Sequence, residues 1–304
     1  MPTLRPETVM RFRPLARLVP ERWTTGSIAA GDGTALHWTD TGSDGPPVVL
    51  LHGVQVDGLS WLRTARALEA DHRVIMPDLR GHGRSGRVHA TVSTQTLVDD
   101  VAVVLEAAGI GHPVIVGHSM GADVAGVLAA QHPMRGVVLV DPVLRPMPPA
   151  MFDVDDPPPW MAAIFGTLRA LGARPHAERV VTGLGMLPPG DEVDWHEADY
   201  VSYVEGQSRF DLALYRHLDA GTPPLAASPA VIAAIGCPIL LLTARPMLPG
   251  ADIEADVTAF TAHWRGGRHM HFPDSGHAIP ADQFERFVDV VTGFIDGLTT
   301  GRDA

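Results

Sequence analysis

Lysine is absent from this chain of 304 residues, and all 23 of its basic residues are arginine. Without a lysine amine, the chain cannot form a Schiff base with a carbonyl substrate or with pyridoxal phosphate. The same absence excludes the phosphate-binding lysine of a Walker A loop and the strand lysine of a protein kinase. Reaction classes that depend on an amine side chain are therefore excluded.

Cysteine occurs once, at Cys237, so the chain can form neither an internal disulfide nor a cysteine-based zinc cluster. Because Cys237 directly precedes an aliphatic run, we expect it to be an inert thiol of the core. Basic residues are outnumbered by 35 acidic ones, which gives a net charge of −12. Nucleic-acid phosphates need clustered cations, so we expect no nucleic-acid partner.

Long apolar segments are also missing. No stretch reaches the roughly 18 apolar residues that a membrane-spanning helix requires. The start of the chain, Met1–Val19, contains four arginines but no apolar segment of the kind found in a secretory signal. We therefore expect a cytoplasmic protein without a membrane span, in which residues 1–22 form an arm lying on the domain.

Short aliphatic runs recur along the chain, and segments with helical periodicity separate them. The runs are nearly continuous, as is typical of parallel strands whose two faces are both covered by helices. They are Val48–Leu51, Val74–Met76, Val114–Val116, Val137–Val140 and Ile239–Leu242. The helical segments between them are Ser60–Ala70, Thr94–Ala108 and Met120–Gln131. This alternation predicts an α/β fold with a mostly parallel sheet, preceded by an antiparallel strand pair that contains Trp38.

The middle of the chain has a different pattern, because aliphatic runs stop between about residues 142 and 229. Prolines and aspartates interrupt the start of this region, and the helical patterns Trp160–Leu171 and Glu197–Leu218 follow. We interpret residues 143–229 as a helical cap inserted into a core that is formed by residues 23–142 and 230–304. The core then resumes with further elements, Ile239–Thr243, Asp252–Trp264, His269–Phe272 and Ala281–Leu298.

The strongest local signal is the motif Gly117-His118-Ser119-Met120-Gly121, which follows a predicted strand and precedes a predicted helix. This G-x-S-x-G motif in that context is typical of a nucleophile elbow, a tight turn that exposes the serine hydroxyl. A side chain at either glycine would collide with neighbouring backbone. The following helix directs its dipole and free amides toward the turn. We therefore predict that Ser119 is a nucleophile.

A serine hydroxyl is a weak nucleophile and needs a base. Among the 15 histidines, His277 is the best placed, because it lies in the loop between the last predicted strand and the last predicted helix. We interpret three others, His52, His82 and His118, as residues that hold loops by hydrogen bonds.

A nucleophilic attack on a carbonyl also needs preorganised amides for the oxyanion. The segment His52-Gly53-Val54-Gln55 follows a predicted strand and contains an H-G-x pattern. We predict that the backbone N–H groups of Val54 and Met120 are the oxyanion donors. Gln55, the next residue of the same loop, is assigned to the substrate site.

Four motifs occur in the order found in the α/β-hydrolase superfamily, and the chain resembles that superfamily from about residue 33 to residue 298. They are His52-Gly53-Val54, the segment Asp78–Ser85 with the pattern D-x-R-G-H-G-x-S, the G-H-S-M-G motif, and Gly276-His277. The resemblance implies an eight-stranded, mostly parallel sheet with a helical cap inserted after the sixth strand.

The acid of the expected triad departs from the usual pattern of the superfamily, in which an Asp follows the seventh strand. Arg245 stands at that place. Asp141, at the end of the sixth predicted strand, is the alternative, since some members, lactonases among them, have their acid there. The order Ser119, Asp141, His277 keeps the chain order of the fold, and the acid would hold the histidine tautomer. Asp252 remains a second candidate, and Asp141 could instead cap a helix or form a hinge to the cap.

The resemblance implies a serine hydrolase that cleaves an ester or lactone of a small to medium apolar substrate, with that small molecule as its partner. Met147, Trp160 and Phe165 are candidates for an apolar pocket under the cap, and equally for the cap's own core. We expect no cofactor. We also expect no metal, because His269 and His271 share a strand face without a third ligand.

Other activities of the same fold remain alternatives. Haloalkane dehalogenases and epoxide hydrolases of this fold use an Asp nucleophile, so Ser119 argues against both. Carbon–carbon bond hydrolases and acyltransferases keep a serine triad. A non-catalytic ligand-binding protein is a further alternative, because a fold does not determine a function.

Overall fold

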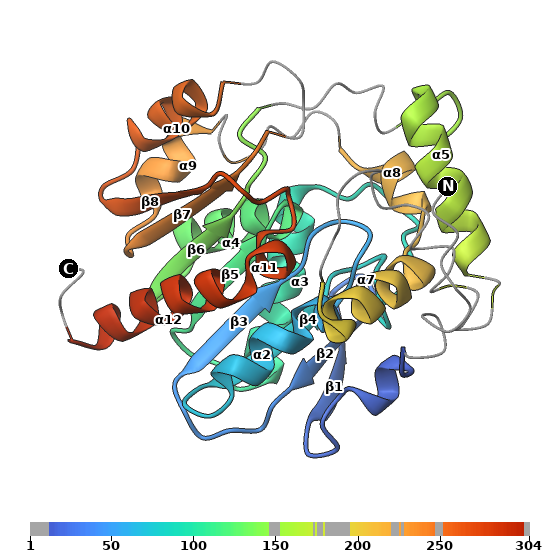
Figure 1. Ribbon diagram of the computed structural model, residues 1–304, viewed down its shortest axis with the longest axis horizontal. Helices are drawn as coiled ribbons and strands as arrows, with labels where there is room; N and C mark the ends of the chain where they lie inside the picture. The colour runs from blue at the N-terminus through green and yellow to red at the C-terminus, as the bar shows by residue number, and fades with distance from the viewer. Residues whose placement is uncertain are drawn as a thin grey trace.

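The computed structural model describes residues 12–145, 153–172, 195–219, 228–246 and 252–300, together with residues 174, 179 and 225. Within these residues eight strands form one sheet in the order β1-β2-β4-β3-β5-β6-β7-β8 (Figure 1). In chain order the strands are β1 (Thr24–Ala29), β2 (Ala35–Asp40), β3 (Pro47–Leu51), β4 (Arg73–Asp78), β5 (Val114–His118), β6 (Gly136–Val140), β7 (Ile239–Ala244) and β8 (Gly267–Phe272).

The sheet is parallel except at its beginning. Strand β2 pairs antiparallel with both β1 and β4, and every other pair of neighbours is parallel. The predicted eight-stranded, mostly parallel sheet is thereby confirmed. Strand β5 lies between β3 and β6, so the loops that follow these three strands meet at one edge of the sheet.

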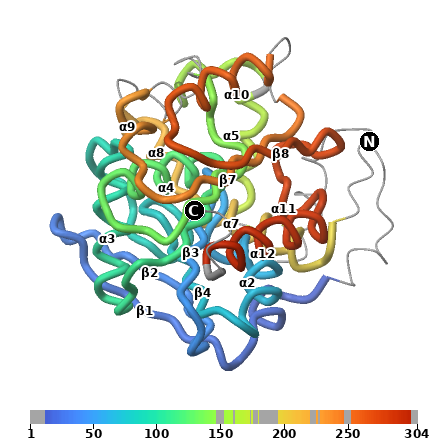
Figure 2. The backbone as a smooth tube through the Cα atoms, turned by 90° about the vertical axis from the view of Figure 1, so that its left-hand side faces the viewer, coloured from blue at the N-terminus to red at the C-terminus, as the bar shows by residue number. Residues whose placement is uncertain are grey.

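Helices cover both faces of the sheet, which explains the continuous aliphatic runs. In β3, Val49 and Leu51 pack on one face, whereas Val48 and Leu50 pack on the other, and all four are fully buried. The first face is covered by α3 (Thr94–Ala107), α4 (Met120–Gln131), α9 (Pro229–Ala234) and α10 (Ile253–Thr261). The second face is covered by α2 (Leu62–Leu68) and α12 (Phe284–Thr300). Figure 2 shows the strands between α3 and α4 on one side and α2 and α12 on the other.

The region between β6 and β7 contains the helices α5 (Pro159–Leu171), α7 (Glu197–Arg209) and α8 (Ala213–His217). Figure 1 shows these three helices on the same side of the molecule, and α7 packs against α2. Short helices lie elsewhere, namely η1 (Leu15–Arg17), η2 (Gly58–Trp61) and α11 (Ile279–Asp282). Among the described helices, none combines the length and apolar character that crossing a membrane would require.

The helical pattern Glu197–Leu218 is divided between two helices in the structure. Helix α7 ends at Arg209, and α8 begins only at Ala213. Asp211 causes the break, because its carboxylate accepts the N–H groups of Ala213 and Val88, at 3.1 and 2.9 Å. Its own N–H donates to the Gly81 carbonyl at 2.8 Å. The hydrogen bonds of Asp211 to Val88 and Gly81 of the core thus end α7 and fix the turn that leads to α8.

Candidate active site

Ser119 lies in the turn between β5 and α4, in a backbone conformation that non-glycine residues rarely adopt. Its φ is 53° and its ψ is −121°. Such a conformation costs about 1–3 kcal/mol and persists only where the surroundings enforce it. Here the Ser119 N–H donates to the Val140 carbonyl of the neighbouring strand at 3.0 Å, and the serine carbonyl accepts the Ala122 N–H at 2.8 Å.

Two glycines make this turn sterically possible. A Cβ atom at Gly117 would lie 2.1 Å from the carbonyl oxygen of Gly121. A Cβ atom at Gly121 would lie 2.5 Å from the carbonyl oxygens of both Leu51 and His52. These neighbours are backbone atoms that cannot rotate away, so the approach of α4 to β3 and β5 requires glycine at both positions.

The loop after β3 passes beside Ser119. A Cβ atom at Gly53 would lie 3.2 Å from the Ser119 Cβ atom. The N–H groups of Val54 and Met120, the predicted oxyanion donors, donate to no acceptor within the described residues. Two backbone donors near a strained serine can bind an oxygen that gains negative charge, because they are already oriented before the charge develops.

His277 follows β8 and contacts the carboxylate of Asp141. Its Nδ1 atom lies 2.6 Å from Asp141 Oδ2. A carboxylate only accepts hydrogen bonds, so the contact assigns the proton of neutral His277 to Nδ1 and leaves a lone pair on Nε2. The imidazole is therefore in the tautomer that can take up a proton on Nε2.

Asp141 is itself held in place on both sides of its carboxylate. It directly follows β6 and has a φ of 44°. The Ala244 N–H donates to Asp141 Oδ1 at 2.9 Å, and the Asp141 N–H donates to the Leu242 carbonyl at 2.8 Å. The carboxylate thus bridges the end of β7 and the imidazole of His277.

His118 connects the serine turn to the loop of His277. Its Nε2 atom donates to the His277 carbonyl at 2.8 Å, and the centres of the two rings are 4.6 Å apart. Burial lowers the pKa of His118 to about 3, and His277 contributes to the shift, so His118 stays neutral. Within the described residues Ser119 Oγ makes no hydrogen bond, and the polar link between the two loops runs through His118. Catalytic hydrogen bonds often form only when a substrate binds.

The second candidate acid, Asp252, has a different position. It is the N-cap of α10, and its Oδ1 atom accepts the Ala255 N–H at 3.1 Å. Arg245, at the place where the superfamily usually has its acid, donates from its N–H and Nε atoms to the Ser275 carbonyl at 3.1 and 3.3 Å. Arg245 therefore holds the loop that leads to His277.

Two of the residues assigned to substrate binding, Gln55 and Phe165, contact the same residue, Tyr215. Gln55 Nε2 donates to the Tyr215 hydroxyl at 2.6 Å. Phe165 is fully buried, and its ring lies 5.2 Å from the ring of Tyr215. Met147 and the side chain of Trp160 lie outside the described residues. In the described part of the chain, no group of three or more His, Cys, Asp or Glu is arranged to hold a metal ion.

Two polar features beside the site involve Asp57 and Asp123, and the sequence gives no signal for the partners of either residue. The first is an ion pair between the buried Asp57 of the loop after β3 and the partly exposed Arg209 of α7. The residues are 152 positions apart, so no local motif could reveal the pair. The second is Asp123, which is almost completely buried in the first turn of α4 and, within the part of the chain that the structure describes, accepts only the Leu225 N–H, at 3.3 Å.

Comparisons with known proteins agree with the fold. A family model for the alpha/beta hydrolase fold matches residues 46–182. Epoxide hydrolase B of Mycobacterium tuberculosis is 44% identical over 99 residues, which cover 31% of this chain and 28% of that protein. A non-heme chloroperoxidase of Streptomyces lividans is 33% identical over 157 residues, 50% of this chain and 56% of that protein. The chain thus aligns with less than two thirds of either curated relative.

A solved structure extends the likeness over most of the chain. A thermophilic esterase from Thermogutta terrifontis has a TM-score of 0.65 at 22% identity and covers 90% of this chain and 99% of its own. At this level of identity the likeness is one of fold.

The buried carboxylate of Asp123 generates a prediction about stability. Burial raises its pKa to about 7, above its ordinary value of 3.8. The folded protein therefore binds more protons than the unfolded chain between about pH 4 and 7, and this residue lowers stability as the pH rises through that range. Asp123→Asn removes the cost while keeping an acceptor for Leu225. We expect its advantage over wild type to grow with pH toward an upper limit on the order of 4 kcal/mol.

Urea unfolding at pH 5 and pH 8 measures this difference. Asp99→Asn, which replaces an exposed carboxylate on α3, is the matched control and should differ from wild type equally at both pH values. A difference between Asp123→Asn and wild type that does not change with pH would show that Asp123 is not a strained buried acid.

Proposed function

Since this chain has the α/β-hydrolase fold, we propose that it is a serine hydrolase that cleaves a carboxylic ester or lactone of a small to medium apolar substrate. The observation that carries the proposal is the 2.6 Å contact between His277 Nδ1 and Asp141 Oδ2, beside the strained turn of Ser119. A nucleophile, a base and an acid that orients the base are the parts that acyl transfer requires.

The reaction begins when Ser119 Oγ attacks the carbonyl carbon and its proton passes to Nε2 of His277. The oxygen of the tetrahedral intermediate accepts hydrogen bonds from the N–H groups of Val54 and Met120. His277 then gives the proton to the leaving alcohol, and an acyl-enzyme remains on Ser119. A water molecule, activated by His277, attacks the acyl group by the same steps in reverse and releases the acid.

Asp141 stabilises the imidazolium that forms twice in this cycle, without taking the proton itself. Because its other oxygen is bonded to the backbone of Ala244, it can orient the ring of His277 without moving. The same machinery would also serve a carbon–carbon bond hydrolase or an acyltransferase. Ser119 argues against the epoxide chemistry of the Mycobacterium tuberculosis relative, since epoxide hydrolases of this fold use an Asp nucleophile.

The direct test is the steady-state hydrolysis of p-nitrophenyl acyl esters of increasing chain length by wild type and Ser119→Ala. We expect turnover by wild type and a loss of about 10⁴-fold or more in kcat for the variant. Mass spectrometry after treatment with a fluorophosphonate should show a single adduct on Ser119. An inert wild type, or a variant as active as wild type, would overturn the proposal.

The assignment of the acid has its own test, in which Asp141→Asn is compared with Asp252→Asn. Asn tolerates the positive φ of position 141 and can still accept the Ala244 N–H, so the fold should be kept. It would favour the wrong tautomer of His277, so we expect kcat to fall by about 10³–10⁴-fold with little change in KM. Asp252→Asn should behave like wild type, because Asn also caps helices well. The opposite pattern would move the acid to Asp252.

A further inference from the structure

The loop after β3, residues 53–57, contains the Val54 N–H. Neighbouring residues hold it at its two ends, where His52 Nδ1 donates to the Gly53 carbonyl at 2.7 Å and the Asp57 carbonyl accepts the Ser60 N–H at 2.9 Å. Gln55 has a φ of 71°, a left-handed conformation that costs a non-glycine residue roughly 1 kcal/mol. The backbone of Gln55 makes one hydrogen bond to the core: its N–H donates to Nε2 of the buried His82 at 3.3 Å. The remaining polar support of Gln55 and Asp57 includes contacts from the helices inserted between β6 and β7.

Helix α8 holds the loop through the side chain of Gln55. Its Nε2 atom donates to the hydroxyl of Tyr215 at 2.6 Å. Tyr215 is buried, and its ring packs against Phe165 of α5 and against Phe210, with ring centres 5.2 and 5.4 Å apart. The hydroxyl is therefore a fixed acceptor, and the amide that reaches it is fixed as well.

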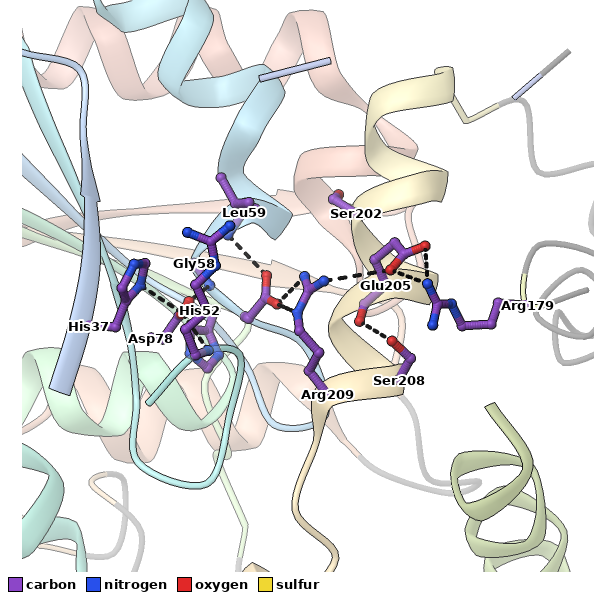
Figure 3. Close-up of polar contacts among 12 residues, drawn as sticks. His37, His52, Gly58, Leu59, Asp78, Arg179, Ser202, Glu205, Ser208 and Arg209 are labelled. Carbon is purple, nitrogen blue, oxygen red and sulfur yellow. Dashed lines mark hydrogen bonds and ion pairs between the residues drawn. The ribbon is translucent and has the colours of Figure 1, made fainter. Parts of the chain in front are cut away.

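Helix α7 holds the same loop two residues later, through an ion pair. Asp57 Oδ2 accepts hydrogen bonds from Nε and Nη2 of Arg209, at 2.9 and 2.5 Å. Asp57 is only 2% exposed, so its burial raises the pKa of its carboxyl while Arg209 opposes that rise. Arg209 in turn lies 3.5 Å from Glu205, which Arg179 contacts at 3.0 Å (Figure 3). The alternating charges form a row that leads from the loop into the inserted helices.

The backbone of α7 also touches the loop directly. At Gly206 a Cβ atom would lie 3.0 Å from both the Val56 Cα atom and the Asp57 nitrogen. The backbone of α7 therefore packs directly against the loop. This close approach is possible because Gly206 has no side chain. This contact is steric, so it is independent of the ion pair of Arg209.

We propose that α7 and α8 set the position of the Val54 N–H, so that helices inserted between β6 and β7 complete the oxyanion site. Gly206 and Arg209 are positioning residues in this arrangement, because they act on the donor through the loop. The inference rests on the proposed acyl-transfer function for its catalytic consequence, whereas the support of the loop by α7 can be tested without any activity.

The sharpest variant is Gly206→Ala, because its added methyl group must push the backbone of residues 56 and 57 by a few tenths of an ångström. Gly166→Ala is the matched control, since Gly166 is also in an inserted helix and a Cβ atom there has nothing within 4 Å. Both changes favour helix formation, so neither should weaken its helix.

For Gly206→Ala we expect kcat for a p-nitrophenyl ester to fall about 10- to 100-fold with KM changed by less than about threefold. This is somewhat less than the effect of deleting an oxyanion donor. Phosphonylation of Ser119 by a fluorophosphonate should slow in parallel, because its phosphoryl oxygen needs the same donors. Gly166→Ala should keep wild-type values. A Gly206→Ala variant with the kcat of wild type would overturn the inference. The proposed function would still stand in that case, provided that Ser119→Ala is inactive.

Amide hydrogen exchange gives the readout that needs no activity. Exchange at residues 53–59 should accelerate in Gly206→Ala and in Arg209→Met, while protection in β5 and α4 is unchanged. Arg209→Lys, which keeps the charge but loses the two-atom contact, should lie between Arg209→Met and wild type. If Arg209→Met does not fold, Gly206→Ala alone decides. Unchanged exchange in the loop of Gly206→Ala would show that α7 does not hold it, even if the wild type hydrolyses no ester.

Discussion

The contact between α4 and the strand ends beside it is the constraint on which the rest of the site depends. Gly117 and Gly121 bring backbone so close that a single added carbon would overlap carbonyl oxygens. This packing forces Ser119 into a strained conformation that a local sequence would not choose. The strain is maintained because β5 lies inside the sheet, between β3 and β6, and is covered by helices on both faces. Any group that is to act with Ser119 must then come from a loop at the same edge.

This geometry explains how a carboxylate that follows β6, instead of β7, can reach the imidazole of His277. Strands β6 and β7 are neighbours, so carboxylates at their ends would approach the same imidazole. Asp141 accepts the backbone N–H of Ala244, and so makes contact with the very end of the strand that usually supplies the acid. The next residue, Arg245, binds the Ser275 carbonyl, two residues before His277. The residue at the position where the superfamily usually has its acid thus supports the loop of His277.

The strands, the serine turn and the loop of His277 could be predicted from the sequence, because each depends on residues close together in the chain. Aliphatic runs, glycine spacing and turn residues are local signals. The contacts of the inserted helices could not be predicted in this way. Arg209 meets Asp57 across 152 positions, and Asp211 stops a helix by binding Val88 and Gly81 of the core. A helical pattern in the sequence continues through that break, since tertiary hydrogen bonds override propensity there.

Two histidines near the site, His82 and His277, differ in how their ring nitrogens are used. His82 uses both ring nitrogens, since Nδ1 donates to the Arg80 carbonyl at 3.0 Å and Nε2 accepts the Gln55 N–H. Burial lowers its pKa to about 3, so the unfolded chain binds more protons between about pH 3 and 6.5, and this residue lowers stability as the pH falls through that window. His277 differs in its hydrogen bonds: within the described residues only its Nδ1 atom makes one, and Nε2 is left to accept a proton. The distinction between them is thus the number of ring nitrogens already in use, which a sequence with 15 histidines cannot display.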